Sequence, residues 1–205
     1  AAAIDLQDSD FMTWINADDR LAAGALATVA DIFTVFDSVH WLGGRIALID
    51  DRGVTTHLSA PHPVGRRAIQ AGLHDGRRFP FIMQEGTFWR GWLWDKVGGV
   101  DISLKLAGDY DLWRKFSQYA HYLLVDSVLA THRKRSGQLS TDMDGYYSEV
   151  ERTLGEEGLA LCEYTWQLFE HPDPAQLEQL RDDFSGRILQ FDRGLQSWQY
   201  SRFPY

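Results

Sequence analysis

Two adjacent carboxylates, Asp18 and Asp19, follow a short block of bulky apolar residues at positions 11–15. This block predicts a buried strand that ends in a polar turn. Open α/β sheets bind ligands outside the carboxyl ends of their strands, so both carboxylates are candidate ligand contacts. Carboxylate oxygens suit a hard divalent cation such as Mg²⁺ or Mn²⁺, which completes its shell with phosphate and water. The alternative is that Asp18 or Asp19 caps a helix beginning near Leu21.

A second acidic segment, Gly108–Trp113, lies where a loop is expected to meet a helix. A carboxylate at this junction acts as a general base if the fold brings it to a reacting hydroxyl. Asp109 is the candidate for that role. A helix cap is the competing interpretation, because side-chain oxygens are favoured at the start of a helix.

The segment His132–Ser140 holds the only dense basic run of an acidic chain. Arginine presents paired donors that match phosphate oxygens, so Arg133 and Arg135 are candidates for binding a diphosphate. A solvated surface loop is the alternative interpretation of the same run.

Composition limits the partners. The 205 residues include 20 Lys and Arg and 29 Asp and Glu, which gives a formal net charge of −9. Nucleic acids are bound chiefly by clustered basic side chains, so we expect no nucleic-acid partner. No apolar run approaches the roughly 18 residues of a transmembrane helix, and the single cysteine, Cys162, forms no internal disulfide. These features predict a cytoplasmic protein, with a peripheral position at the inner face of the membrane as an alternative.

The spacing of apolar residues predicts the elements that must position these side chains. Strands are expected at 11–15, 39–42, 45–50, 54–57, 80–83 and 122–131. Helices are expected at 22–36, 66–71, 92–97 and 109–120, and the chain becomes helical after Ser140. Strands mixed with helices indicate an α/β fold class, with a core over 1–140 and a C-terminal helical extension over 141–205.

The C-terminal extension is predicted to contain two helices between Met143 and Tyr205, separated at Pro172 and Pro174. In the second helix the apolar residues recur at steps of three or four and form one stripe, made of Leu177, Leu180, Phe184, Ile188 and Phe191. Such a stripe must be covered, so we expect it to pack on the core or to form a homodimer with a second copy.

Taken together, these segments resemble the bacterial glycosyltransferase family 2, whose catalytic domain has the GT-A fold, a Rossmann-like fold of nucleotide-diphospho-sugar transferases. The matching motifs follow the family's order and spacing over about Ile4 to Ser140, and they are Trp14–Asp19, Gln84–Arg90, Trp94–Asp101, Gly108–Trp113 and Arg133–Ser140. Family members carry Glu or Ala where this chain has Gly108, and many carry His where it has Arg135. The family's domain begins with nucleotide-binding strands ahead of the Asp-Asp strand, so we expect that amino-terminal part to be missing here.

The resemblance implies an inverting glycosyltransferase. Such an enzyme moves a sugar from a nucleotide-diphospho-sugar donor to a hydroxyl of a saccharide or lipid-linked acceptor, here in the synthesis of a surface polysaccharide or glycoconjugate. By resemblance, Asp19 binds the Mn²⁺ or Mg²⁺ ion that bridges the diphosphate, and Asp18 faces the donor ribose or the metal. Asp109 takes the proton of the acceptor hydroxyl. The resemblance implies that Arg133 and Arg135 contact the departing diphosphate of the donor. It also implies contacts to the sugar or the acceptor from Gln84, Glu85 and the segment Trp89–Trp94.

Two other classes of protein stay open. A glycoside hydrolase would use paired acids such as Glu85 and Asp109, and it would need neither a metal nor a phosphate-binding arginine. A non-catalytic binding or assembly module derived from the same fold is the second alternative.

Overall fold

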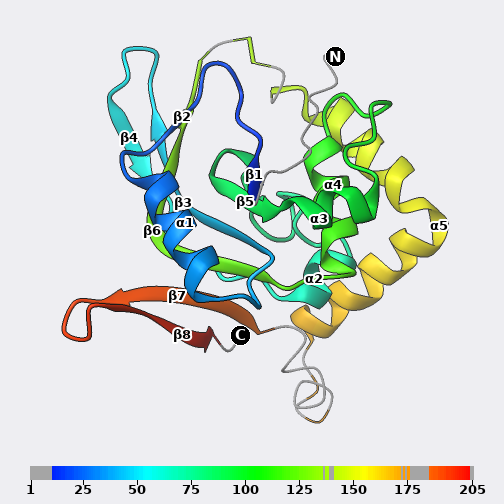
Figure 1. The fold of residues 1–205 in the computed structure, drawn as a ribbon. Helices are drawn as coiled ribbons and strands as arrows, with labels where there is room; N and C mark the ends of the chain where they lie inside the picture. Colours follow the sequence, from blue (N-terminus) through cyan, green and yellow to red (C-terminus); the bar gives the residue numbers. More distant parts are fainter. Residues whose placement is uncertain are drawn as a thin grey trace.

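The computed structural model describes residues 11–135, 137–138, 141–171, 173, 175 and 185–203. One mixed sheet organises them (Figure 1), with the strand order β1-β5-β3-β6-β7-β8 and with β2 paired to β6 and β4 to β3. The strands are β1 (Phe11–Thr13), β2 (Arg20–Leu21), β3 (Trp41–Ile49), β4 (Thr55–Leu58), β5 (Thr87–Arg90), β6 (Tyr122–Arg133), β7 (Gly186–Asp192) and β8 (Ser197–Phe203). The helices are α1 (Ala25–Val35), α2 (Arg66–Gln70), the 3₁₀ turn η1 (Gln84–Gly86), α3 (Gly91–Val97), α4 (Gly108–Ser117) and α5 (Met143–Glu170). The predicted α/β fold class is confirmed.

Strands β3 and β6 form the parallel centre of the sheet, and their register ends with Ile49 opposite Arg133. The two strands pack closely at Gly44, where an added Cβ would lie 2.3 Å from Cγ of the fully buried Leu129. Because both strands run in one direction, their carboxyl ends meet at one edge of the sheet. Ligand sites of open α/β sheets lie outside such an edge.

Helices cover both faces of the sheet (Figure 1). On one face α1 buries Val29, Ile32 and Phe33 against Leu42 and Phe88 of the sheet. These residues of α1 recur at three- and four-residue steps, which explains why the sequence pattern predicted a helix here. On the other face lie α2, α3 and α4, and α5 runs outside them. The centre of the sheet is therefore shielded from water on both sides, whereas β4 at its margin is exposed.

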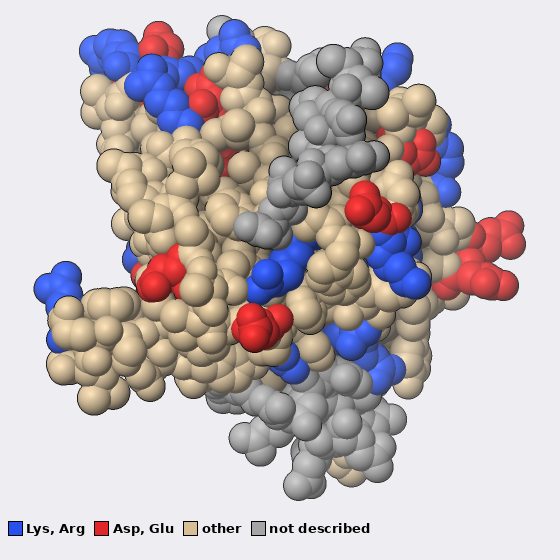
Figure 2. Space-filling model, in the orientation of Figure 1, with Lys and Arg blue, Asp and Glu red and all other residues tan. Residues whose placement is uncertain are grey.

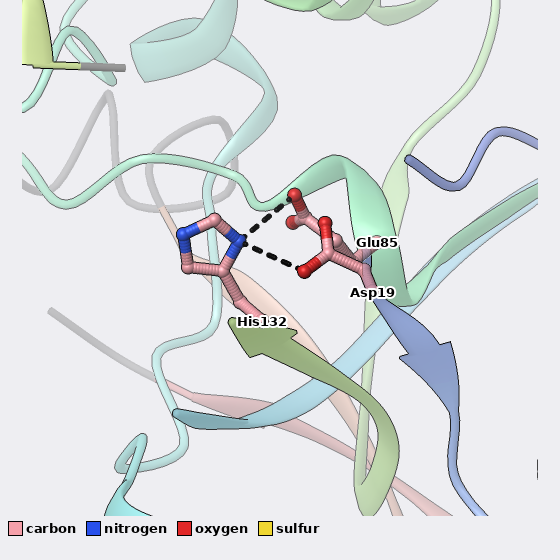
Figure 3. Close-up of side chains that lie close together, drawn as sticks. All are labelled: Asp19, Glu85 and His132. Atoms are coloured by element: carbon pink, nitrogen blue, oxygen red, sulfur yellow. Dashed lines mark ion pairs between the residues drawn. The ribbon is translucent and has the colours of Figure 1, made fainter. Parts of the chain in front are cut away.

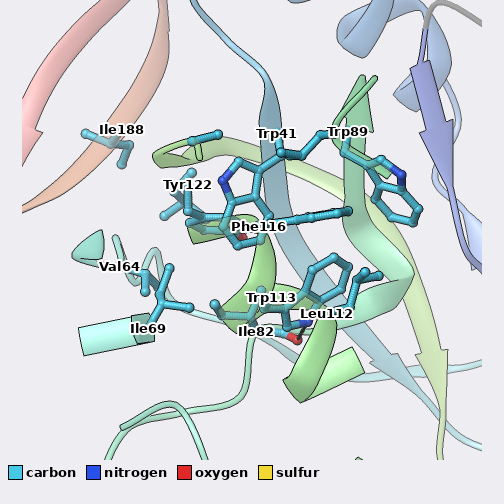
Figure 4. Packing of buried hydrophobic residues seen from close by; sticks show 13 residues of the cluster. Trp41, Val64, Ile69, Ile82, Trp89, Leu112, Trp113, Phe116, Tyr122 and Ile188 are labelled. Carbon is cyan, nitrogen blue, oxygen red and sulfur yellow. Dashed lines mark hydrogen bonds between the residues drawn. The ribbon is translucent and has the colours of Figure 1, made fainter. Parts of the chain in front are cut away.

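Aromatic rings fill the core beneath α3 and α4 (Figure 4). The ring centroids of Trp41 and Trp113 lie 5.5 Å apart in a stacked arrangement, and Phe116 packs edge-on against Trp41. Trp89 is only 1% exposed and belongs to the same cluster, so it is not available to a sugar. Within the segment implied to contact ligands, Trp92 is the most exposed ring, with 43% of its area exposed, and Trp94 is partly buried.

Helix α5 is long but interrupted. Gly155 has a φ of 63°, a left-handed conformation that favours glycine, and it breaks the helical backbone inside the element. Before this break, Tyr146 and Val150 pack on the start of α4. After it, Cys162 packs near α2. No helix in the described part of the chain is long and apolar enough to cross a membrane.

The prediction of helix up to the C-terminus is wrong for residues 186–203, which form the antiparallel hairpin β7–β8. Strand β7 pairs in parallel with β6 and so extends the central sheet. The adjacent Ile188 and Leu189 are both buried, one on each face of the sheet. The three-residue step from Ile188 to Phe191 imitated a helical stripe, but burial on two faces is the pattern of an internal strand. The earlier members of the predicted stripe, at 177, 180 and 184, lie outside the described residues.

Two shorter predictions also need correction. Residues 80–83 form no strand, and the strand of this region is β5, which pairs with β1 and β3. The strands predicted at 39–42 and 45–50 are one continuous strand, β3. Elsewhere in the described residues the predicted elements are confirmed, including the hairpin of β3 and β4 around Gly53. Pro172 and Pro174, where the helical extension is expected to break, lie outside the described residues.

Candidate metal centre

Three side chains that are distant in the sequence meet at the carboxyl end of β6. Asp19 immediately precedes β2, Glu85 lies in η1, and His132 is the last residue but one of β6. One ligand atom from each lies within 4.8 Å of the other two. The Nδ1 atom of His132 is 3.4 Å from Oδ1 of Asp19 and 3.3 Å from Oε1 of Glu85 (Figure 3). Both carboxylates are buried and the imidazole is half-buried.

The turn at Asn16–Asp19 and strand β6 hold Asp19 in place. Strand β2 pairs antiparallel with β6, with Arg20 opposite Thr131, which brings Asp19 beside the end of β6. There the backbone N–H of Arg133 donates a hydrogen bond of 2.8 Å to Oδ1 of Asp19. The side-chain amide of Asn16 lies 3.4 Å from the other carboxylate oxygen. Contacts of this kind to a carboxylate orient it for a metal.

Glu85 reaches the cluster because η1 packs tightly on the sheet. A Cβ at Gly86 would lie 2.6 Å from Cδ1 of Ile46, so glycine is needed for this close approach. The hydroxyl of Thr87 donates to the carbonyl of Met83 at 2.8 Å and closes the turn. Gln84 is buried in the same turn.

Two buried carboxylates shift the pKa values of the groups in this cluster. Burial raises the pKa of Asp19, the backbone hydrogen bond from Arg133 opposes the rise, and the charge of Glu85 adds to it. These two carboxylates also raise the pKa of the His132 imidazole, and Glu85 has a larger effect than Asp19. Two buried negative charges are costly unless a positive charge compensates them. A protonated His132 supplies such a charge, and a cation bound between the carboxylates would supply it when the imidazole is neutral.

The donor atoms of the cluster fit a divalent cation. Oε2 of Glu85 is buried and has no hydrogen-bond partner, and the buried Nδ1 of His132 contacts the two carboxylates only as an ion pair. Buried polar atoms are normally satisfied, so these two atoms beside a second carboxylate, that of Asp19, mark an unusual place in the fold. Asp19, Glu85 and His132 could together offer two carboxylate oxygens and one imidazole nitrogen to an ion. Positions around the ion would remain for other ligands.

Asp18 points away from this cluster. Its carboxylate pairs with Arg135, whose Nε lies 2.9 Å from Oδ2. The structure therefore brings Asp19, and not Asp18, into the cluster that could hold a metal. The alternative that either residue caps a helix is wrong, because α1 begins at Ala25 and its N-cap is Gly24.

The two arginines predicted to bind a diphosphate have different surroundings. The guanidinium of Arg133 donates to the backbone carbonyls of Asp50 and Asp51, at 2.8 and 3.0 Å. Its Nε donates to the carbonyl of Asp18 at 3.3 Å. Arg133 thus joins three chain segments at the edge of the sheet. The side chain of Arg135 is 59% exposed and remains accessible at the rim. Figure 2 shows Lys and Arg side chains gathered over this end of the molecule, near β2 and β4.

Asp109 lies in the first turn of α4, close enough to the cluster for the charge of Glu85 to act on it. Burial raises its pKa to about 6, and the charge of Glu85 contributes to the rise. The backbone N–H of Tyr110 donates 2.8 Å to its carboxylate and opposes the shift. The N-cap of α4 is Ala107, so Asp109 is not the cap of this helix. Asp111 instead turns to Lys115 on the same helix.

His132 was missed as a ligand from the sequence. It was read as the first residue of a basic run, whereas the structure places it inside β6 with its ring against two carboxylates. The available signal was its position at the carboxyl end of a predicted strand, the same criterion that selected Asp19. The sequence matches no protein-family model, and a search of curated proteins finds no match to it.

Proposed function

We propose that this protein is a metal-dependent inverting glycosyltransferase that uses a nucleotide-diphospho-sugar donor. The observation that carries the proposal is the placement of two different chemical groups together. One is the cluster of Asp19, Glu85 and His132, which fits a divalent cation. The other is Asp109, a carboxyl whose pKa of about 6 responds to the charge of Glu85. A cation site beside a separate base is what such a transfer requires.

The proposed resident ion is Mn²⁺. The motif resemblance admits Mn²⁺ or Mg²⁺, but Mg²⁺ strongly prefers an all-oxygen shell, whereas imidazole is an ordinary ligand of transition metals. His132 therefore favours Mn²⁺ over Mg²⁺. When bound, the ion would neutralise negative charge on a departing diphosphate.

The residues of the chain supply the remaining chemistry. The acceptor hydroxyl oxygen forms a bond to the anomeric carbon while the bond from that carbon to the diphosphate oxygen breaks. The diphosphate leaves with the electron pair, and the carboxylate of Asp109 takes the hydroxyl proton. A base with a pKa near the working pH is well suited to this step. Attack from the face opposite the leaving group inverts the anomeric carbon.

Exposed Arg135 is the arginine best placed to contact the diphosphate, because its side chain lies at the rim of the site. Bidentate contacts between guanidinium and phosphate are strong and directional. Arg133 supports the same site indirectly, since its guanidinium binds the backbone of the turns that form it. We propose a saccharide or lipid-linked acceptor.

Calorimetric titration with MnCl₂, followed by uridine diphosphate in the presence of Mn²⁺, tests the proposal. We expect Asp19→Asn, Glu85→Gln and His132→Gln each to weaken Mn²⁺ binding by at least about tenfold, the scale of losses seen when metal sites are altered. Asp18→Asn is the matched control, because this neighbouring carboxylate points to Arg135. It should leave Mn²⁺ affinity within about twofold.

Equal Mn²⁺ affinity in all four variants and the wild type would refute the metal centre. Hydrolysis of a glycoside that continues in the presence of a chelator would assign the protein to the hydrolases instead. Metal and diphosphate binding without transfer to any acceptor, together with no effect of Asp109→Asn, would indicate a binding module.

A further inference from the structure

The start of α5 is tied to the start of α4, the helix that carries Asp109. Tyr146 and Val150 of α5 form one buried cluster with Ala107 and Tyr110 of α4. The charge of Asp109 also acts on Tyr146, which places the base beside this cluster. The N-terminal half of α5 thus lies behind the proposed catalytic carboxylate.

Glu149 makes a polar contact between α5 and the segment that leads into α4. Its Oε2 accepts hydrogen bonds from the backbone N–H groups of Lys105, Leu106 and Ala107, at 3.0, 2.8 and 2.9 Å. Oε1 also lies 3.0 Å from the N–H of Lys105. Three consecutive amides therefore converge on a single carboxylate, which is only 14% exposed. Hydrogen bonds that involve an ionised group are stronger than neutral ones.

Helix α4 has no cap of its own at this end. The N-cap residue is Ala107, which has no side-chain acceptor, and no side chain caps the helix from that position. The first N–H groups of a helix need partners outside it. Glu149 supplies one from another helix, at a residue only two positions before Asp109. Its negative charge is also favourable at the positive end of α4.

The loop ahead of this contact is exposed. Ile102 is 93% exposed, and the contacts that Asp101 makes to Ser103 and Leu104 remain within the loop. The bonds to Glu149, together with the packing of Leu106 and Ala107 in the buried cluster, join this segment to the body of the molecule before α4 begins. Loss of those bonds would release the backbone N–H groups of residues 105–107 and weaken the hold on the segment that leads to Gly108.

We infer that Glu149 is a positioning residue for the proposed reaction, which holds the first turn of α4 so that the Asp109 carboxylate stays beside the metal centre. The inference rests on the proposed function. Glu149 touches neither the metal ligands nor the reacting atoms, and it acts through the backbone of residues 105–107. A displacement of about 1 Å in a catalytic group can cost on the order of a hundredfold in rate, so such a contact matters for turnover.

The charge of Glu149 is present throughout the working pH range. Burial raises the pKa of its carboxyl, but the backbone bonds from Lys105, Leu106 and Ala107 outweigh this and hold the pKa below its ordinary value. The Glu149 carboxylate, which with its bonds to residues 105–107 is called the clamp below, therefore stays ionised over the pH range in which Asp109 titrates. Its contribution to positioning should not change between pH 5 and pH 8.

The test compares four variants by steady-state transfer, amide hydrogen exchange and carboxyl NMR. Glu149→Gln keeps one acceptor oxygen and Glu149→Ala keeps none. Glu151→Gln alters an exposed acid of the same helix, and Val150→Ala loosens the same buried cluster without removing an acceptor. We expect kcat to fall in the order wild type, Glu149→Gln, Glu149→Ala, with a loss of at least about tenfold in the last. The KM for the donor and the affinity for Mn²⁺ should stay within about twofold of the wild type.

Physical readouts separate this inference from the function on which it rests. In Glu149→Ala the amides of residues 105–107 should exchange faster, and the pKa of Asp109 should move from about 6 towards its ordinary 3.8 as the carboxyl gains water. Unchanged exchange and an unchanged Asp109 pKa would overturn the inference even if transfer is observed. An equal loss of kcat in Val150→Ala would also overturn it, because general loosening would then suffice. A wild type that transfers no sugar would instead count against the proposed function, and the exchange and NMR results would still decide the clamp.

Discussion

Asp109 combines a proposed chemical role with a cost to stability. Its carboxyl has a folded-state pKa of about 6, compared with 3.8 in an ordinary setting. The folded state thus favours the protonated form. The stability that this preference gives is fully present below about pH 3.8 and is lost as the pH rises through 6. At neutral pH the protein keeps an ionised carboxylate in a place that disfavours it, which is common for catalytic groups.

We predict opposite effects of Asp109→Asn on activity and on stability. Transfer should fall by about a hundredfold to ten-thousandfold, because the base is lost. In the same variant the free energy of unfolding at pH 8, without added metal, should rise on the order of 2 kcal/mol. At pH 4.5 the gain should be less than half as large, because wild-type Asp109 is already largely protonated there. Urea unfolding at the two pH values measures this, and a destabilised variant at pH 8 would show that Asp109 has a structural role.

Much of the site was predictable from residue types and their place after strands. Asp19, Glu85 and Asp109 were all selected from the sequence, and the structure brings Asp19 and Glu85 into one cluster and Asp109 within reach of the charge of Glu85. The orientation of neighbouring side chains was not predictable. Adjacent Asp18 and Asp19 differ because only Asp19 receives the backbone N–H of Arg133. That contact depends on the pairing of β2 with β6, which no local pattern reveals.

At the element scale, the parallel pair β3 and β6 depends on a glycine. A Cβ at Gly44 would lie 2.3 Å from Cγ and 2.7 Å from Cδ1 of Leu129, which is fully buried. A Cβ at position 44 would therefore fit only if the strand or the Leu129 side chain moved. The pair also sets the edge at which His132 meets Asp19, so a displaced strand would disturb the metal centre.

We predict that Gly44→Ala lowers the free energy of unfolding by about 1–3 kcal/mol, the usual cost of overpacking a core. Leu129→Ala should by itself cost about 2–5 kcal/mol through the cavity it leaves. In the double variant the added methyl has room, so the total cost should be clearly less than the sum of the two. Denaturant unfolding of all four proteins gives the coupling. Simple additivity would mean that the two side chains do not compete for this space.

The helices and strands were predicted correctly where the spacing of apolar residues along the chain is enough to identify them. Helices α1 and α4 each bury one face, so a three- and four-residue spacing identified them. The first part of β7 is buried on both faces, at Ile188 and Leu189, and this removes the two-residue alternation that marks an ordinary strand. Its assignment depends on a neighbour, β6, that lies some sixty residues earlier in the sequence.

At the scale of the whole molecule, the C-terminal hairpin completes the central sheet. Ile188 is 2% exposed and Leu189 is 0% exposed, and they enter the two core clusters on opposite faces. Gly186 lies so close to Pro63 that a Cβ would approach its backbone carbon to 2.4 Å. Strand β8 is joined mainly to β7, and its Trp198 donates a hydrogen bond of 3.0 Å to Asp31 of α1.

Two truncations distinguish the contributions of these strands. A chain that ends after Asp192 loses β8 but keeps β7, and we expect it to fold with a lower melting temperature. A chain that ends after Ser185 also loses Ile188 and Leu189. Large core side chains contribute about 2–5 kcal/mol each by truncation, against a total stability of about 5–15 kcal/mol for a typical domain.

The shorter chain also exposes the edge of β6, and an unpaired edge with apolar faces favours aggregation. We therefore expect the chain that ends after Ser185 to be aggregated or to bind a hydrophobic dye without a cooperative thermal transition. Circular dichroism melts and dye fluorescence of the two truncated chains make the comparison. If the shorter chain melts cooperatively near the temperature of the longer one, then β7 is an attached strand and the sheet that positions the metal centre is complete without it.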